Sequence, residues 1–330
     1  MKSRGLHFGV AAAVLLALGS SVWAQPPKGD AAKRPAFRLP DSVVVERDVE
    51  YGKAGQRPLK LDLVRPRKPS DKPLPVIVFV HGGGWRGGDK SNGVWNVLPF
   101  VAGGNYFGAS VGYRLSGEAI WPAQIHDCKA AIRWLKANAK KYNLDPDRIG
   151  VWGSSAGGHL VSLLGTSGDV KELEGDCGSP DQSSRVACVV DFCGPSDFLA
   201  AARFQRQGLP SPALANSPES LLLGGPIDEK KDLARQASPV TYASADDPPF
   251  LIVHGTEDPL VPLKQAELLQ AALKKAGASA TLLKIRGGGH GIGGPQVSKR
   301  VRAFLDKHLR GLDATIEDET IEAPLAPKKK

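Results

Sequence analysis

The chain has 330 residues, with 43 lysines and arginines against 34 aspartates and glutamates and a pI near 9.3. Hydrophobic residues make up 42% and charged residues 23%, which excludes a disordered tail or a coiled coil. The 38 glycines follow no G-X-Y period, so the chain is not collagen-like. Basic residues are scattered and often stand beside acidic ones, which favours a solvated surface over nucleic-acid binding.

The first residues predict an export signal. Lys2 and Arg4 precede an apolar stretch over residues 8–18, and Val22-Trp23-Ala24 matches the small-residue pattern of a cleavage site. The apolar stretch is shorter than the ~20 residues that a membrane-spanning helix needs. We therefore expect a signal peptide over residues 1–24, cleavage after Ala24, and a secreted or periplasmic mature chain with no membrane span.

Downstream, buried strands alternate with amphipathic helices. Residues 25–42 are basic and rich in proline and are predicted to form a flexible leader. Apolar runs and alternations predict strands at 43–51, 59–64, 76–80, 106–111, 148–152, 186–192, 250–253 and 280–285. Helical spacing predicts helices at 121–142, 156–164, 263–276 and 296–309. This alternation predicts an α/β fold with a mostly parallel sheet of about eight strands and helices on both faces.

Two segments lack this alternation. Prolines interrupt residues 195–248 repeatedly, and we expect a small irregular lid with short helices there, inserted into a catalytic domain over residues 43–310. Residues 311–330 are acidic, then proline-rich, and end in three lysines, so they are predicted to form a flexible tail.

The four cysteines leave alternatives open. In an oxidising compartment Cys128, Cys177, Cys188 and Cys193 allow three disulfide pairings, and buried free thiols are the other interpretation. The sequence contains no C-x-x-C pair and no other metal-ligand spacing of cysteine and histidine. We therefore expect no metal and no other cofactor.

The clearest chemical motif is a candidate nucleophile. Residues 153–157 read Gly-Ser-Ser-Ala-Gly, which matches G-x-S-x-G with Ser155 at its centre. The motif follows a predicted strand and opens a predicted helix, where a tight turn exposes the serine hydroxyl at the edge of the sheet.

Glycines upstream of this motif predict an oxyanion hole. Residues 81–85 read His-Gly-Gly-Gly-Trp and end a buried strand. The backbone N–H groups of Gly83 and Gly84, together with that of Ala156, could converge on a developing oxyanion. A phosphate-binding P-loop is excluded, because the required Gly-Lys pair is interrupted at Asp89.

A nucleophilic serine needs a base, and the base needs a group that orients it. His290 lies in a glycine-rich loop between a strand and a helix and is the best candidate base. Asp258 follows the strand at 250–253 and completes the chain order Ser-Asp-His, with Glu257 and Asp197 as alternatives. The remaining histidines of the mature chain are interpreted as structural or surface residues: His81, His126, His159, His254 and His308.

These motifs together resemble the α/β-hydrolase superfamily. The likeness is to its His-Gly-Gly-Gly esterase and lipase branch, which is hormone-sensitive-lipase-like, and most of all to secreted bacterial feruloyl- and acetyl-esterase-like proteins. It extends over residues 43–310. It implies an α/β-hydrolase fold, in which the nucleophile, acid and base are Ser155, Asp258 and His290, and the oxyanion donors are Gly83, Gly84 and Ala156.

The resemblance implies a secreted serine carboxylesterase that acts through an acyl-enzyme on short-chain acyl or aryl esters. Acetyl or feruloyl groups on polysaccharides are the suggested substrates, so the expected partner is a small-molecule or polysaccharide-linked ester. Trp85, Tyr113 and Arg114 fall near the active edge and are candidate substrate-binding residues, with packing as their alternative role. A serine peptidase of the prolyl-peptidase-like branch and a non-catalytic binding protein on the same scaffold are the alternative functions.

Overall fold

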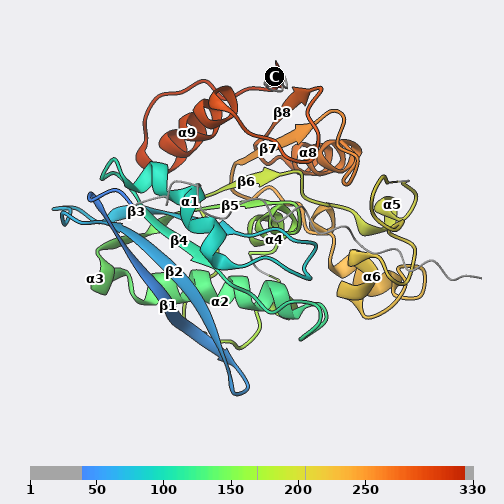
Figure 1. Cartoon of the computed structure of the whole chain (residues 1–330), viewed down its shortest axis with the longest axis horizontal. Coiled ribbons are helices and arrows are strands. Elements are labelled where there is room, and N and C mark those ends of the chain that lie inside the picture. The colour runs from blue at the N-terminus through green and yellow to red at the C-terminus, as the bar shows by residue number, and fades with distance from the viewer. Residues whose placement is uncertain (1–38, 169, 205, 324–330) are drawn as a thin grey trace, which may run out of the picture. The chain divides into compact units, whose positions relative to one another are not determined.

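Nine strands form one mixed sheet in the computed structural model, in the order β1-β2-β4-β3-β5-β6-β7-β8-β9 (Figure 1). The structure describes residues 39–168, 170–204 and 206–323. The predicted signal peptide and most of the predicted leader lie outside these residues.

The sheet is antiparallel at one edge and parallel elsewhere. β1 (Val43–Ala54), β2 (Arg57–Pro66) and β4 (Phe107–Val111) pair antiparallel. From β4 onward every pairing is parallel. These strands are β3 (Leu74–Val80), β5 (Leu144–Ser154), β6 (Cys188–Phe192), β7 (Phe250–Gly255), β8 (Ala280–Arg286) and β9 (Glu319–Glu322).

Helices cover both faces, as predicted. α1 (Lys90–Val101) and α9 (Pro295–Arg310) pack on one face. The other face is covered by α2 (Ala123–Ala137), α4 (Ala156–Thr166) and α8 (Lys264–Ala276). The single helix predicted at 121–142 is two helices, because the chain leaves helical geometry at Asn138 before α3 (Ala139–Tyr142) begins. α1 was not predicted.

The C-terminal segment corrects the predicted strand number and tail. β9 pairs with β8 and adds a ninth strand, so the prediction of a flexible tail is wrong for residues 319–322. The Asp318 carboxylate accepts hydrogen bonds from the Leu282 backbone N–H at 2.9 Å and from Lys274 Nζ at 2.7 Å. These contacts fix the start of β9 against β8 and α8, and the folded domain extends beyond residue 310.

The described part of the proline-rich segment over 195–248 contains only short helices. They are α5 (Phe198–Ala201), α6 (Pro218–Leu223), α7 (Lys231–Gln236) and the 3₁₀ turn η2 (Pro239–Thr241), and another 3₁₀ turn, η1 (Lys171–Leu173), precedes β6. Among the described helices, none is long and apolar enough to cross a bilayer.

The parallel strands bring the predicted motifs together. The carboxyl ends of parallel strands lie at one edge of a sheet, and the segments after them carry function in open α/β sheets. The glycine loop follows β3, Ser155 follows β5, Asp258 follows β7 and His290 follows β8. Four segments far apart in sequence therefore reach the same edge.

Candidate active site

Ser155 occupies a strained turn between β5 and α4. Its backbone has φ 56° and ψ −120°, a conformation that costs a non-glycine residue about 1–3 kcal/mol. The flanking glycines let the turn pack this tightly. A Cβ at Gly157 would lie 2.1 Å from the Val80 carbonyl oxygen, and one at Gly153 would lie 2.3 Å from the Gly157 oxygen. The motif therefore needs glycine at both positions.

His290 and Asp258 are hydrogen-bonded to each other, as predicted. His290 Nδ1 lies 2.8 Å from Asp258 Oδ2, and the Asp258 side chain is fully buried. Asp258 Oδ1 accepts hydrogen bonds from the backbone N–H groups of Leu260 and Val261, at 2.8 and 3.0 Å. Burial alone would raise the pKa of Asp258, but hydrogen bonds from His254, His290 and Val261 outweigh it and hold that pKa below its ordinary value. The carboxylate is therefore ionised when it orients His290.

His254 supports Asp258 from the interior. The imidazole is fully buried on β7, and its Nε2 lies 2.7 Å from the Val261 carbonyl oxygen and 3.5 Å from Asp258 Oδ2. Because a carbonyl oxygen can only accept a hydrogen bond, His254 Nε2 carries the proton, and this N–H group also faces the Asp258 carboxylate. His254 is structural, as predicted, and it also contacts the acid of the candidate triad.

One cavity joins the nucleophile to the base and to the candidate oxyanion hole. Its volume is about 710 Å³, and Ser155, His290, Gly83, Gly84 and Ala156 all line it. No described group accepts a hydrogen bond from the N–H of Gly83, Gly84 or Ala156. Gly83 and Gly84 have φ of 116° and 59°, which explains why glycine stands at both positions. The cavity thus offers three unused donors beside the serine.

The proline-rich segment supplies another wall of this cavity. Arg206 and Glu219 line it and form a bidentate ion pair, with Nη1–Oε1 at 2.8 Å and Nη2–Oε2 at 2.7 Å. Their side chains are only 4% and 3% exposed. Leu209 and Pro218 add apolar surface. These wall residues were not predicted, since neither spacing nor motif connects them to the triad.

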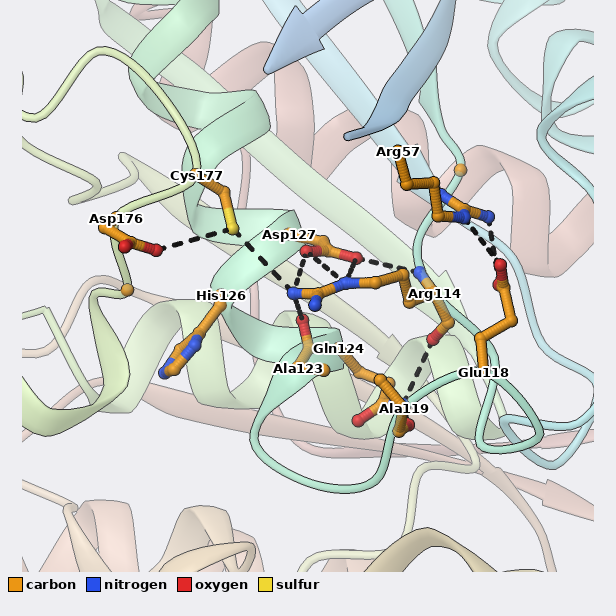
Figure 2. A network of polar contacts seen from close by, with 12 residues as sticks. Arg57, Arg114, Glu118, Ala119, Ala123, Gln124, His126, Asp127, Asp176 and Cys177 are labelled. Atoms are coloured by element: carbon orange, nitrogen blue, oxygen red, sulfur yellow. Dashed lines mark hydrogen bonds and ion pairs between the residues drawn. The ribbon is translucent and has the colours of Figure 1, made fainter. Parts of the chain in front are cut away.

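Arg114 and Tyr113 have structural roles instead of the predicted substrate-binding role. The Arg114 guanidinium forks around the buried Asp127 carboxylate, with contacts between 2.7 and 3.1 Å, and also donates to the Ala123 carbonyl (Figure 2). Tyr113 stacks on His81 at 4.3 Å and donates its hydroxyl to the His81 carbonyl oxygen at 2.9 Å. Neither residue lines the cavity, so packing, the alternative interpretation, describes both.

Trp85 lines the cavity but is almost completely buried. Its Nε1 donates to His159 Nδ1 at 3.2 Å, and His159 Nε2 in turn donates to the Ala237 carbonyl oxygen at 2.6 Å. His159 therefore links the glycine loop to the proline-rich segment, and both of its hydrogen bonds require the neutral imidazole.

The burial of His159 predicts a loss of stability in acid. Burial lowers its pKa to about 4, against about 6.5 in an unfolded chain. Between these two pKa values the unfolded state binds more protons than the folded state. The contribution of His159 to the free energy of unfolding is therefore complete above pH 6.5 and falls by about 3 kcal/mol as the pH reaches 4. We expect His159→Gln, which can keep one donor and one acceptor, to flatten the dependence of the free energy of unfolding on pH in urea titrations. An unchanged slope between pH 4 and 6.5 would contradict this role.

All four cysteines are free in the structure, and all are buried. The buried-thiol interpretation therefore describes them, and the disulfide pairings do not form. Cys193, which directly follows β6, has a positive φ of 46°.

The chain is similar to known esterases. The probable carboxylic ester hydrolase LipM of Mycobacterium tuberculosis is 32% identical over 252 residues, which cover 75% of this chain and 57% of LipM. A truncated carbohydrate esterase from gut microbiota superposes with a TM-score of 0.72 and 32% identity, over 81% of this chain and 96% of that chain. The propionate-bound Est2 esterase of Thermogutta terrifontis superposes with a TM-score of 0.64 and 26% identity, over 82% of this chain and 94% of Est2.

The chain spans little more than half the length of the curated relatives it matches, at 57%, 56% and 53% for the first three. The likeness to the solved esterases confirms the α/β-hydrolase fold that the sequence predicts. The family model described as BD-FAE matches residues 61–273, which include the glycine loop, Ser155 and Asp258. The chain therefore belongs to the BD-FAE family of α/β-hydrolase esterases.

Proposed function

We propose that this protein is a serine carboxylesterase that removes short acyl groups from carbohydrate esters. The observation that carries the proposal is a single cavity lined by Ser155, by three residues with unused N–H donors and by an imidazole that is hydrogen-bonded to a buried carboxylate. Both solved neighbours named above are esterases, one of carbohydrates and one with bound propionate. A short acyl ester of a sugar combines the alcohol part suggested by the carbohydrate esterase with the short acyl part suggested by the propionate-bound esterase.

The geometry supports an acyl-enzyme mechanism. His290 Nε2 takes the proton of Ser155 Oγ as the hydroxyl attacks the ester carbonyl, and Asp258 holds Nδ1–H and stabilises the imidazolium. The negative oxygen that develops is stabilised by the N–H groups of Gly83, Gly84 and Ala156, each worth about 3 kcal/mol of barrier. The alcohol takes the proton from His290 and leaves, and water then repeats the sequence on the acyl group.

A substrate panel tests this proposal. Initial rates with 4-nitrophenyl acetate, butyrate and palmitate, with methyl ferulate, and with acetylated xylan should show the highest kcat/KM on acetyl or butyryl esters and release of acetate from the polysaccharide. A matched acetanilide distinguishes an esterase from a peptidase-like enzyme. A preference for palmitate or for the amide would overturn the assignment.

Removal of the His254 side chain should weaken catalysis through Asp258. We expect His254→Leu to lower kcat/KM by about tenfold to a hundredfold, because a hydrogen bond to a charged group is worth about 1.5–3 kcal/mol and each 1.4 kcal/mol is a factor of ten. His254→Gln retains an N–H donor and should recover part of the loss. His308→Gln on α9 is the matched control, because His308 packs on Phe304 and does not line the cavity. Equal activity of the Leu and Gln variants would argue against this role.

We also propose that the protein is exported and that cleavage occurs after Ala24. The basic start, the apolar stretch and the small residues at 22–24 support this location. N-terminal sequencing of the protein recovered outside the cytoplasm should begin at Gln25. Recovery of an intact N-terminus would contradict export by this signal.

A further inference from the structure

Folding places Cys193 against the Asp258–His290 pair. The Cys193 Sγ, one carboxylate oxygen of Asp258 and one ring nitrogen of His290 all lie within 4.8 Å of one another. β6 lies between β5, which leads to Ser155, and β7, which leads to Asp258, so the residue that follows β6 stands between nucleophile and acid. A hydrogen bond from Cys193 N–H to the Val253 carbonyl oxygen, at 3.0 Å, fixes the thiol's position relative to β7.

These three side chains offer the ligand types that zinc prefers. Zn²⁺ binds thiolate sulfur, imidazole nitrogen and carboxylate oxygen at about 2.0–2.3 Å, usually in a tetrahedron. Ligand atoms in such a site stand roughly 3.3–3.8 Å apart. An ion would therefore push His290 Nδ1 and Asp258 Oδ2 apart from their 2.8 Å hydrogen bond, and no pair of the three ligand atoms needs to close by more than about 1 Å. Among the described residues, this is the one group of three or more histidine, cysteine or acidic side chains whose ligand atoms lie so close together. The sequence predicts no metal, because the ligands come from three separate strand ends.

From this juxtaposition we infer that Zn²⁺ binds Cys193, Asp258 and His290 and reversibly inhibits the enzyme, an inference whose inhibitory part rests on the proposed function. A zinc–sulfur bond forms as the Cys193 thiol releases its proton to solvent. A zinc–nitrogen bond forms at His290 Nδ1, whose lone pair is free only when the ring proton is on Nε2. Nε2 then carries the proton and cannot accept one from Ser155, so the ion holds the base in the wrong tautomer.

The ion can reach this group from the cavity. The His290 side chain is 22% exposed and lines the cavity, whereas the side chains of Cys193 and Asp258 are buried and do not line it. The backbone on either side of His290 is not tightly packed, since a Cβ added at Gly289 or Gly291 would meet no atom within 4 Å. A shift of the imidazole would expose the thiol and the carboxylate together.

Inhibition of the full-length protein provides the first test. Initial rates with 4-nitrophenyl acetate are measured over a range of ZnCl₂ in a buffer that does not bind metals, and EDTA should restore the rate. Cys193→Ser should keep its zinc-free rate within a few-fold and raise the half-inhibitory zinc concentration at least tenfold. Cys188→Ser is the matched control, because Cys188 is a buried cysteine at the start of β6, the strand that Cys193 follows, and does not belong to the group. Equal sensitivity of Cys193→Ser and the wild type would overturn the inference.

Direct binding separates this inference from the proposed function. Calorimetric titration of Ser155→Ala with ZnCl₂ should show a site that is absent from the double variant Ser155→Ala/Cys193→Ser, whether or not the wild type hydrolyses esters. Cys193→Ala replaces Cys193→Ser in both experiments if the serine variant does not fold. Identical binding isotherms of the single and the double variant would overturn the inference. If the double variant lacks the zinc site but the wild type hydrolyses no ester, only the proposed function is overturned.

Discussion

Replacement of Ser155 by alanine should reduce ester hydrolysis by about 10⁴-fold or more and leave the fold intact. Ser155 is the residue at the centre of the strained turn, and its hydroxyl stands in the cavity that also contains His290 and the three free N–H donors. Alanine keeps the backbone of the turn and removes only the attacking oxygen. The measurements are kcat/KM on 4-nitrophenyl acetate and the free energy of unfolding in urea.

Ser154→Ala is the matched control for this prediction. Ser154 is the neighbouring serine of the same motif and also lines the cavity, but the hydrogen-bond partner of its Oγ among the described residues is Cys193 Sγ, at 4.0 Å, and not His290. Its alanine variant should keep kcat/KM within a few-fold of the wild type. The catalytic assignment fails if Ser155→Ala hydrolyses the ester at the wild-type rate, or if Ser154→Ala loses as much activity as Ser155→Ala.

The candidate triad was predictable because its residues occupy local geometry that the sequence indicates directly. A non-glycine residue at φ 56° needs small residues two positions away on either side, and the clashes that a Cβ would cause at Gly153 and Gly157 show this need. Chain order and strand ends then identify Asp258 and His290. The glycine loop was predictable for the same reason, since free N–H groups at a ligand-facing turn favour residues without side chains.

Features that depend on tertiary contacts were missed. α1 contains Gly93 and Pro99, which weaken any helical signal, but a Cβ at Gly93 would lie 2.1 Å from Ser110 Oγ, so packing of the helix against β4 requires glycine there. Arg114 was predicted to contact substrate because it falls near the active edge, whereas its actual partner, Asp127, is fully buried on α2, 13 residues later in the chain. Neither contact leaves a pattern within a short window of sequence.

β9 was missed because its strand character depends on a neighbour. Residues 319–322 read Glu-Thr-Ile-Glu, a short charged segment that resembles a solvated tail. Ile321 is buried and pairs with Ile285 of β8, and Glu319 forms an ion pair with Arg300 of α9. Short charged edge strands are typical of sheets that avoid pairing with other chains, and composition alone does not distinguish them from frayed termini.

Removal of one partner of the Arg206–Glu219 pair should cause the largest loss of stability from a single substitution in the cavity wall. Glu219→Ala leaves the Arg206 guanidinium buried with its Nε unpartnered and only the Pro210 carbonyl as acceptor. Breaking a buried ion pair from one side costs about 3–5 kcal/mol, because the remaining charge has lost both water and its counter-ion. We expect a loss of this size in urea unfolding, together with a lower kcat/KM as the wall beside Ser155 is disturbed.

Two further variants separate charge burial from loss of packing. Arg206→Met/Glu219→Met removes both charges and should recover most of the stability, since apolar residues of similar volume often replace a buried pair without cost. Asp232→Ala breaks an exposed ion pair with Arg235 of α7 and should change the free energy of unfolding far less, because water already screens both partners. If Glu219→Ala were as stable as Asp232→Ala, the pair would not hold the wall in place. Recovery of both stability and kcat/KM in the double variant would show that the wall needs a filled volume at this position and not the charges themselves.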